Sequence, residues 1–328
     1  MKKTVSVAPM MDCTDRHDRF FLRLISKNVK LYSEMVATKS ALHGDRKKIL
    51  GYSPEEKPLA LQVGGSDKKE LAEVSKIAED MGYDEININL GCPSKKVQKN
   101  KFGACLMKEP DLVSECINEM INSCNIPVTA KTRIGFDDTE NFEYLNTFIL
   151  KMKSAGCKTF IIHARKAILK GLTPKQNLNI PKLNYKMVYK IKKENPDLEI
   201  IINGGISKIE EIKENLKICD GVMIGRAIYQ NPYFLVDIEK EIFNVNNNPS
   251  REEIVEKLLK YLEKEVKIGT KVNHIMRHTV GLYHGQAGSK KWKRYLSDNM
   301  MARDSDFQKA KHIMSIVQNN EKVKQTIA

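Results

Sequence analysis

The chain has 328 residues, of which 41% are hydrophobic and 29% charged, and it carries a formal net charge of +14. No apolar run approaches the roughly 18 residues needed to cross a bilayer, and the first residues are too charged for a signal peptide. The seven cysteines include no Cys-x-x-Cys pair, which argues against a disulfide framework or a zinc site. We therefore expect a cytoplasmic globular protein of more than one domain, with no membrane segment and no metal.

Eight short apolar runs alternate with amphipathic segments in the first three quarters of the chain. They predict strands at Val5–Pro9, Leu31–Met35, Leu59–Val63, Glu85–Leu90, Val128–Thr132, Thr159–His163, Ile200–Asn203 and Gly221–Ile224. The segments between them include predicted helices at Lys68–Met81, Asp111–Cys124 and Ile206–Leu216. Eight such units indicate a closed (β/α)8 TIM barrel. An open doubly wound sheet is the alternative, but the Gly-x-Gly-x-x-Gly turn expected after its first strand is missing.

A polar stretch near residue 248 ends this pattern, and no strand signal follows it. Ser250 and Glu253 have the spacing of a capping box that opens a new helix. Further helices are predicted at Glu252–Lys267, Val272–Tyr283 and Asp304–Gln318. His274 and His278 stand four residues apart there, but no carboxylate between them supports a metal site. We interpret residues 1–243 as the barrel domain and residues 250–328 as a small helical-bundle domain.

The positive charge is concentrated toward the C-terminus. The last 84 residues carry 16 Lys/Arg against 9 Asp/Glu, whereas the first 244 carry 39 against 32. Lys290-Lys291-Trp292-Lys293-Arg294-Tyr295 is the densest basic stretch and holds the only tryptophan. A basic, aromatic surface of this kind favours a nucleic-acid partner. The alternatives are a merely solubilising lysine content and a helix whose Trp292 packs inward.

Polar residues and glycines gather where the predicted strands end, which is where barrel active sites lie. Cys92 follows the fourth strand, after Asn87 and Asn89, whose amides can hydrogen-bond an amide-bearing ring; a buried core cysteine is the alternative. Gly204-Gly205 and Gly225-Arg226 follow strands seven and eight, where barrels commonly hold phosphate. Met10, Gln62, Lys131 and His163 complete this rim. Their chemistry fits a flavin: an amide and a cation for the ring edge and a thioether beneath it.

Seven segments resemble, in order and spacing, the motif series of the tRNA-dihydrouridine synthases. They are Ala8–Asp12, Leu61–Gly65, Asn87–Pro93, Lys131–Gly135, His163–Arg165, Asn203–Gly205 and Gly225-Arg226. The stretch from Leu169 to Tyr185 resembles the A subfamily, which is associated with uridines 20 and 20a of the D-loop. Two residues depart from that pattern: Leu178 stands where arginine is usual, and Lys182 where a second proline is usual.

The resemblance implies reduction of the C5–C6 bond of tRNA uridines by FMN, with NADPH as reductant. Hydride would pass from the reduced flavin to C6, and Cys92 would protonate C5, as suits a thiol that is mostly protonated at neutral pH. Cys105 is the competing thiol, which we expect to pack rather than react.

The resemblance also implies a tRNA partner and two groups of binding residues. We expect the protein to be a monomer. The expected FMN contacts are Pro9, Met10, Met11, Gln62, Lys131, His163, Asn203, Gly204, Gly205, Gly225 and Arg226. The expected uridine or tRNA contacts are Asn89, Arg133, Arg165, Lys175 and Arg294. Two other functions remain open: an FMN barrel that reduces a free pyrimidine, and a non-catalytic RNA-binding barrel.

Overall fold

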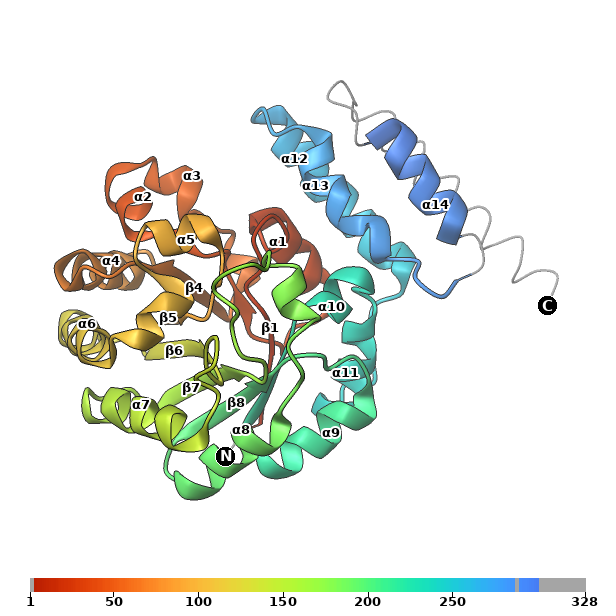
Figure 1. Cartoon of the computed structure of the whole chain (residues 1–328). Helices are drawn as coiled ribbons and strands as arrows, with labels where there is room; N and C mark the ends of the chain where they lie inside the picture. The colour runs from red at the N-terminus through yellow and green to blue at the C-terminus, as the bar shows by residue number, and fades with distance from the viewer. Residues whose placement is uncertain (1–2, 287–288, 301–328) are drawn as a thin grey trace. The chain divides into compact units, whose positions relative to one another are not determined.

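The computed structural model describes residues 3–286 and 289–300 (Figure 1), and the helix predicted at Asp304–Gln318 lies outside them. The contacts divide the chain into two compact units. The barrel unit holds residues up to Thr14 and then Val29–Gly225, and the helical unit holds Asp15–Asn28 together with the chain from Arg226 onward. The assignment of functions to domains 1–243 and 250–328 stays a prediction.

The barrel unit is built on parallel strands. They are β1 (Thr4–Val7), β2 (Leu31–Tyr32), β3 (Val36–Ala37), β4 (Leu59–Gly64), β5 (Glu85–Leu90), β6 (Val128–Arg133), β7 (Thr159–His163), β8 (Glu199–Asn203) and β9 (Gly221–Ile224). Their hydrogen-bonded order is β1-β9-β8-β7-β6-β5-β4-β2. Lys30 closes the ring, because its N–H donates to Val5 O at 3.0 Å and its carbonyl accepts from Val7 N at 2.9 Å. The predicted TIM barrel is therefore confirmed.

Only the first two residues of the second predicted strand, Leu31–Met35, form a strand in the structure, and β3 begins just beyond its predicted end. Both β2 and β3 pair with β4, and the ladder breaks between them at Ser33. The Ser33 side chain causes the break, because its hydroxyl accepts the N–H of Gln62 at 2.9 Å where a backbone carbonyl would continue the ladder. The sequence predicts one continuous strand because its residue types suit β structure. The hydrogen bond between Gln62 N and the Ser33 hydroxyl, which interrupts the ladder, cannot be predicted from them.

Helices surround the barrel strands (Figure 1). They are α2 (Thr38–His43), α3 (Arg46–Ile49), α4 (Lys68–Asp80), α5 (Lys95–Lys99), α6 (Pro110–Ser123), α7 (Phe142–Ser154), α8 (Tyr185–Glu194) and α9 (Ile209–Ile218). The Asp67 carboxylate begins α4 by accepting from the N–H groups of Lys69 and Glu70. Helix α9 begins three residues later than predicted, since the Glu211 carboxylate accepts from Ser207 N and Lys208 N and thereby caps it.

Side chains from five strand positions and from Ala8, just after β1, fill the barrel interior. Ala8, Tyr32, Ala60, Ile161, Ile201 and Met223 form one buried cluster. Small residues on some strands face large ones on others, which is how a closed barrel reaches the packing density of a solid core. The interior below the rim is thus a packed core, and the side chains at the strand ends rest on it.

The described residues of the helical unit form helices only. They are α1 (Arg16–Ile25), α10 (Arg226–Gln230), α11 (Phe234–Phe243), α12 (Arg251–Lys267), α13 (Val272–Met276), a 3-10 turn (Arg277–Gly281), α14 (Ser289–Tyr295) and a final turn (Leu296–Met300). The predicted capping box is confirmed at α12, where Glu253 N donates to Ser250 Oγ at 3.2 Å and Ser250 N donates to Glu253 Oε2 at 2.8 Å. None of the helices in the described ranges is long and apolar enough to cross a membrane.

Helix α1 follows β1 in the chain but packs with helices more than 200 residues later. The Asp15 carboxylate caps α1 and also accepts from Arg277 Nη2 at 2.6 Å and His278 Nε2 at 3.1 Å. Although burial would raise the pKa of Asp15, the hydrogen bond and charge of His278 hold it well below its usual range. Phe20 stacks on Tyr261 with ring centroids 3.8 Å apart. These contacts assign α1 to the helical unit.

The barrel interior predicts a clear stability difference between two isoleucines. Ile201 is 1% exposed in the interior cluster, whereas Ile218 at the end of α9 is 46% exposed. Ile201→Ala should lower the free energy of unfolding by about 2–5 kcal/mol, because it leaves a cavity in a packed core. Ile218→Ala should change it by about 0.5 kcal/mol. Urea denaturation of the full chain measures both, and equal losses would contradict this account of the core.

Candidate functional site

The loop after β5 holds Cys92 in a fixed position at the end of its strand. Asn89 Oδ1 accepts from Gly91 N at 3.1 Å and from Cys92 N at 3.0 Å, which turns the chain sharply. Arg133 Nε donates to Gly91 O at 2.8 Å, and Ala104 N donates to Cys92 O at 2.9 Å. The thiol is therefore carried by a loop that neighbouring elements hold on both sides.

A glycine allows this close packing around Cys92. Gly103 adopts φ +78°, and a Cβ at this position would lie 2.6 Å from Cys92 O. Any other residue would be strained here and would push the loop outward. Cys105, two residues later, donates from Sγ to Phe102 O at 3.1 Å, so the competing thiol is engaged with its own turn.

The Cys92 thiol is half-buried and stays protonated at neutral pH. Burial raises its pKa from the ordinary 9.0. A backbone hydrogen bond from Ser94 and the charges of Arg133 and Lys131 act in the opposite direction without overcoming burial. A protonated thiol in this position can donate its proton, and the two cations nearby can stabilise the thiolate that remains.

Cationic side chains gather at the ends of β6 and β7. Lys131 Nζ donates to Asn203 Oδ1 at 3.0 Å, and Asn203 Nδ2 donates in turn to Met223 O at 2.8 Å. Burial, followed by the charge of Arg133, lowers the pKa of Lys131 to about 7. Burial also lowers the pKa of Arg133, to about 10. Burial thus disfavours the charged forms of Lys131 and Arg133, and an electron-rich ligand bound beside them would stabilise those charges.

His163 ends β7 beside this cluster and is 8% exposed. Burial, with the charges of Arg133 and Lys131, holds its pKa well below 6.5, so the ring is neutral. Its Nδ1 atom is buried and has no hydrogen-bond partner within the described chain. A buried polar atom of this kind normally has a partner, so Nδ1 marks a place for a ligand group.

Amide side chains from adjacent strands form a ladder beneath the rim. Asn89 Nδ2 donates to Gln62 Oε1 at 2.8 Å, and Gln62 Nε2 donates to Asn87 Oδ1 at 2.8 Å. Gln62 and Asn87 are almost completely buried. The structure therefore brings together two predicted site residues, Gln62 and Asn89, and joins them directly to the Cys92 loop.

The predicted phosphate-binding glycines adopt the backbone that glycine favours. Gly204 has φ +124° and Gly205 has φ +72°. A Cβ at Gly225 would lie 3.3 Å from Met10 Sδ, so the end of β9 and the loop after β1 lie side by side. Pro9 and Met10 are half-buried, whereas Met11 is 54% exposed. Arg226 begins α10 in the helical unit, and its predicted role stays a prediction.

Two predicted uridine-binding arginines hold the segment from Leu169 to Leu183. Arg133 Nη1 donates to Lys166 O at 3.0 Å and to Asn177 O at 3.3 Å. Arg165 Nη1 donates to Pro181 O and to Asn179 O. Lys175 in this segment is exposed, as is Lys182, and Leu178 is half-buried. Both arginines thus shape the wall beside Cys92, and their contact with a uridine stays a prediction.

Three residues that were not predicted as part of the site support it. Glu85 and Thr129 lie beneath the amide ladder, and the Asn177 side chain fixes the loop at Ile168 through both its amide atoms. Alternating polar positions in β5 and β6 could have revealed the first two, because one face of each strand points into the barrel. Asn177 lies in the stretch that resembles the A subfamily, and that resemblance is the signal that could have marked it.

Trp292 corrects one prediction about the basic stretch of α14. Trp292 is 2% exposed, its Nε1 donates to Thr279 O at 3.0 Å, and its ring meets that of Tyr283 edge-on. The indole therefore packs inward because its N–H and its ring both find partners inside the helical unit. Lys290, Lys291, Lys293 and Arg294 are exposed, and Arg294 lies 3.6 Å from Asp298.

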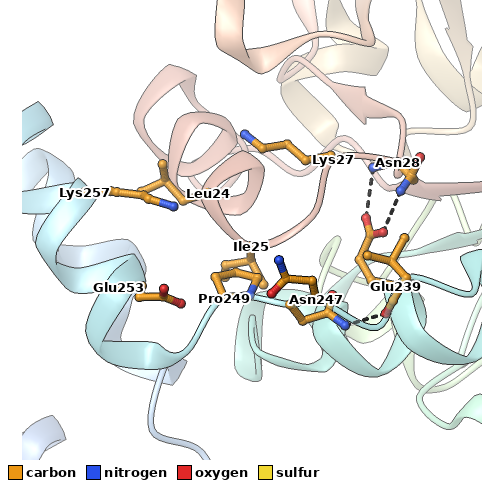
Figure 2. Close-up of a pocket in the computed structure, with 11 residues that line it drawn as sticks. Leu24, Ile25, Lys27, Asn28, Glu239, Asn247, Pro249, Glu253 and Lys257 are labelled. Atoms are coloured by element: carbon orange, nitrogen blue, oxygen red, sulfur yellow. Dashed lines mark hydrogen bonds between the residues drawn. The ribbon is translucent and has the colours of Figure 1, made fainter.

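A pocket of about 260 Å³ lies within the helical unit. Charged and amide side chains line it together with Leu24, Ile25, Val245 and Pro249 (Figure 2). Glu239 in its wall accepts from Asn28 N at 2.9 Å and Asn28 Nδ2 at 2.6 Å, and also from Ser26 Oγ. Glu253, also in the wall, is engaged in the capping box of α12. Both carboxylates thus brace the unit. Among the residues described, no group of three or more His, Cys, Asp or Glu could hold a metal ion.

The chain matches known proteins along most of its length. The family model described as "Dihydrouridine synthase (Dus)" matches residues 6–320. A Synechocystis sp. protein named tRNA-dihydrouridine(20/20a) synthase is 50% identical over 298 residues, covering 90% of this chain and 89% of the relative. An Escherichia coli protein of the same name is 48% identical over 314 residues, covering 95% and 91%.

A solved structure of morphinone reductase in complex with tetrahydroNAD aligns with a TM-score of 0.50 at 10% identity, covering 76% of this chain and 89% of that one. At this identity the likeness concerns the fold, and it agrees with the parallel barrel described above. The family match and the identities carry the classification: the chain belongs to the dihydrouridine synthase family.

Proposed function

We propose that this chain reduces the C5–C6 bond of uridines 20 and 20a in the tRNA D-loop to give dihydrouridine, using FMN with NADPH as reductant. The observation that carries the proposal is the Cys92 loop held at the barrel rim by Asn89 and Arg133, which places the thiol near the buried Lys131 and Arg133. The uridine positions come from the names of the relatives.

The residues at the rim fit FMN. The unpartnered Nδ1 of His163 and the Lys131 ammonium, with its pKa of about 7, both call for a polar ligand group. Gly204 and Gly205 have the backbone conformation that lets peptide N–H groups approach a phosphate. Gln62, Asn203, Pro9, Met10, Met11, Gly225 and Arg226 would complete the binding site. When bound, FMN supplies the hydride that C6 of the uracil receives.

The protein's own part in the reaction centres on Cys92. Its S–H bond breaks as the proton passes from Sγ to C5 of the uracil, and a thiolate remains. Arg133 and Lys131 stabilise that thiolate, since their charges lower the pKa of Cys92. A proton from solvent then restores the thiol. Asn89, whose Oδ1 accepts a hydrogen bond from Cys92 N, would orient the edge of the uracil ring.

A tRNA substrate explains the basic helical unit. A uridine stacked within folded tRNA cannot reach a buried site, so it must be flipped out at a cost of a few kcal/mol. Phosphate contacts from exposed cations such as those of α14 would supply that energy. A free-pyrimidine reductase has less support, because the family match extends through the helical unit to residue 320.

Replacing Cys92 should separate flavin chemistry from product formation. Cys92→Ala should keep bound FMN and its reduction by NADPH, but lower dihydrouridine formation on tRNA at least about 100-fold, because no acid protonates C5. Cys105→Ala is the matched control and should retain activity, since the Cys105 thiol donates a hydrogen bond to Phe102 O within its own turn. Undiminished product from Cys92→Ala, measured by nucleoside mass spectrometry, would exclude Cys92 as the acid.

FMN affinity should depend on pH through Lys131. An electron-rich ligand favours the charged ammonium, so binding raises the lowered pKa of Lys131 and takes up a proton. Affinity should therefore fall as pH rises above about 7, by at most about tenfold per pH unit. Lys131→Met should bind FMN more weakly and with a flat profile from pH 7 to about 9. Flavin fluorescence titration measures this, and a flat profile for the unmodified protein would contradict it.

The exposed lysines of α14 should contribute to tRNA affinity. Lys290→Ala combined with Lys293→Ala should weaken tRNA binding and reduce the slope of log K against log salt by about one for each lost phosphate contact. Lys260→Ala in α12 is the control, because Lys260 is also exposed but its Nζ lies 3.3 Å from Glu256 Oε1. Filter binding across salt concentrations tests this, and an unchanged slope in the double variant would remove α14 from the interface.

A further inference from the structure

We propose that Glu85 and Thr129 are positioning residues, which orient the site amides and the Cys92 loop through a one-way chain of buried hydrogen bonds. The effect on catalysis rests on the proposed function, whereas the effect on the loop does not. Glu85 begins β5, Thr129 is the second residue of β6, and neither is among the expected cofactor or substrate contacts.

The chain begins at the Glu85 carboxylate. Glu85 Oε2 accepts from Lys30 Nζ at 2.7 Å, and Oε1 accepts from Tyr32 Oη at 2.7 Å and from Thr129 Oγ1 at 2.7 Å. Burial and the charge of Glu85 raise the pKa of Tyr32, so the phenol keeps the proton that it donates. Thr129 Oγ1 has its own hydrogen committed to Glu85, so it accepts the next bond, from Asn87 Nδ2 at 2.8 Å.

The same direction continues upward through the amides. Asn87 Oδ1 accepts from Gln62 Nε2, and Gln62 Oε1 accepts from Asn89 Nδ2, both at 2.8 Å. Asn89 Oδ1 then accepts from the backbone N–H of Gly91 and of Cys92. Each link therefore presents an oxygen toward Cys92 and a nitrogen toward Glu85.

Chemistry at both ends prevents reversal. A carboxylate paired with Lys30 accepts hydrogen bonds, and the peptide nitrogen of Cys92 can only donate. An amide between them could flip only by placing two donors or two acceptors together in a buried place, where an unmet polar group is costly. Gln62, Asn87 and Asn89 are 1%, 0% and 8% exposed, so water does not offer an alternative partner.

The fixed direction has a consequence for the ligands that the site can take. The chain uses one N–H of Gln62 and one of Asn89, so each amide keeps a second N–H. A donor at these two positions suits the carbonyl oxygens of a flavin or uracil ring. Reversal would present acceptors there instead and would release the turn that holds Cys92.

Thr129 offers the sharpest test, because valine has its shape without its hydroxyl. Thr129→Val should leave Asn87 Nδ2 without its acceptor and lower kcat for dihydrouridine formation by about 10- to 100-fold, with little change in KM for tRNA. It should also speed alkylation of Cys92 by iodoacetamide in the FMN-loaded enzyme, measured by peptide mass mapping with the six other cysteines as reference. Thr129→Ser, which restores the hydroxyl, should return both values toward those of the unmodified enzyme.

Thr159→Val is the matched control. Thr159 Oγ1 donates to Glu199 Oε2 at 2.7 Å, across the register pair of β7 and β8, and this bond does not lead to the site amides. Thr159→Val should therefore keep kcat and Cys92 alkylation unchanged. Glu85→Gln should lower kcat like Thr129→Val, since its amide can donate to Thr129 and reverse the chain. Thermal melting identifies any variant that fails to fold, and the threonine pair still decides if Glu85→Gln does.

Three results would overturn the proposal: unchanged kcat and alkylation in Thr129→Val, no recovery in Thr129→Ser, or an equal loss in Thr159→Val. Failure of the proposed function looks different. In that case the unmodified enzyme would form no dihydrouridine on tRNA, while the alkylation rates would still test whether Thr129 positions the Cys92 loop.

Discussion

A polar group on the inner face of this barrel must find its partner inside, because a closed sheet offers neither an edge nor water. Much of the site follows from that constraint. The amides of Gln62, Asn87 and Asn89 form hydrogen bonds with one another across strands, and Thr129 and the backbone of the Cys92 loop supply their remaining partners. The turn at Cys92 is the upper end of that arrangement, so a reactive loop inherits the rigidity of the barrel core. Closure of the barrel and order at the thiol are parts of one network.

The second constraint on the site is the buried positive charge at the barrel rim. Lys131 and Arg133 bond amide and carbonyl oxygens rather than carboxylates, and burial lowers the pKa of both. Among the residues that the structure describes, no carboxylate forms an ion pair with either cation. That arrangement costs stability in the absence of ligand, and it favours ligands that are electron-rich or become negatively charged during reaction.

The periodic part of the structure could be predicted from the sequence, and the parts that depend on single side chains could not. Strands Glu85–Leu90, Thr159–His163 and Gly221–Ile224 agree with the prediction to the residue, because each is a short segment of alternating or continuous apolar residues bounded by turn signals. The break at Ser33, the late start of α9 and the inward Trp292 each depend on the hydrogen bonds of a single side chain. At the site, strand ends located Cys92, Lys131 and Gln62, but the support of Gln62 and the Cys92 loop by Glu85 and Thr129 could be found only from the register between strands.

The path of the chain through the helical unit has a consequence for synthesis. Helix α1 buries Phe21, Leu22 and Ile25, yet Tyr261, which stacks on Phe20, is made more than 230 residues later. At about 5–20 residues per second, a ribosome needs on the order of 10 to 50 seconds to cover that distance. During that time the residues of α1 have been synthesised, but the later helices that pack against α1 have not. Its assembly is therefore among the last events of folding, after the chain of the barrel has left the ribosome.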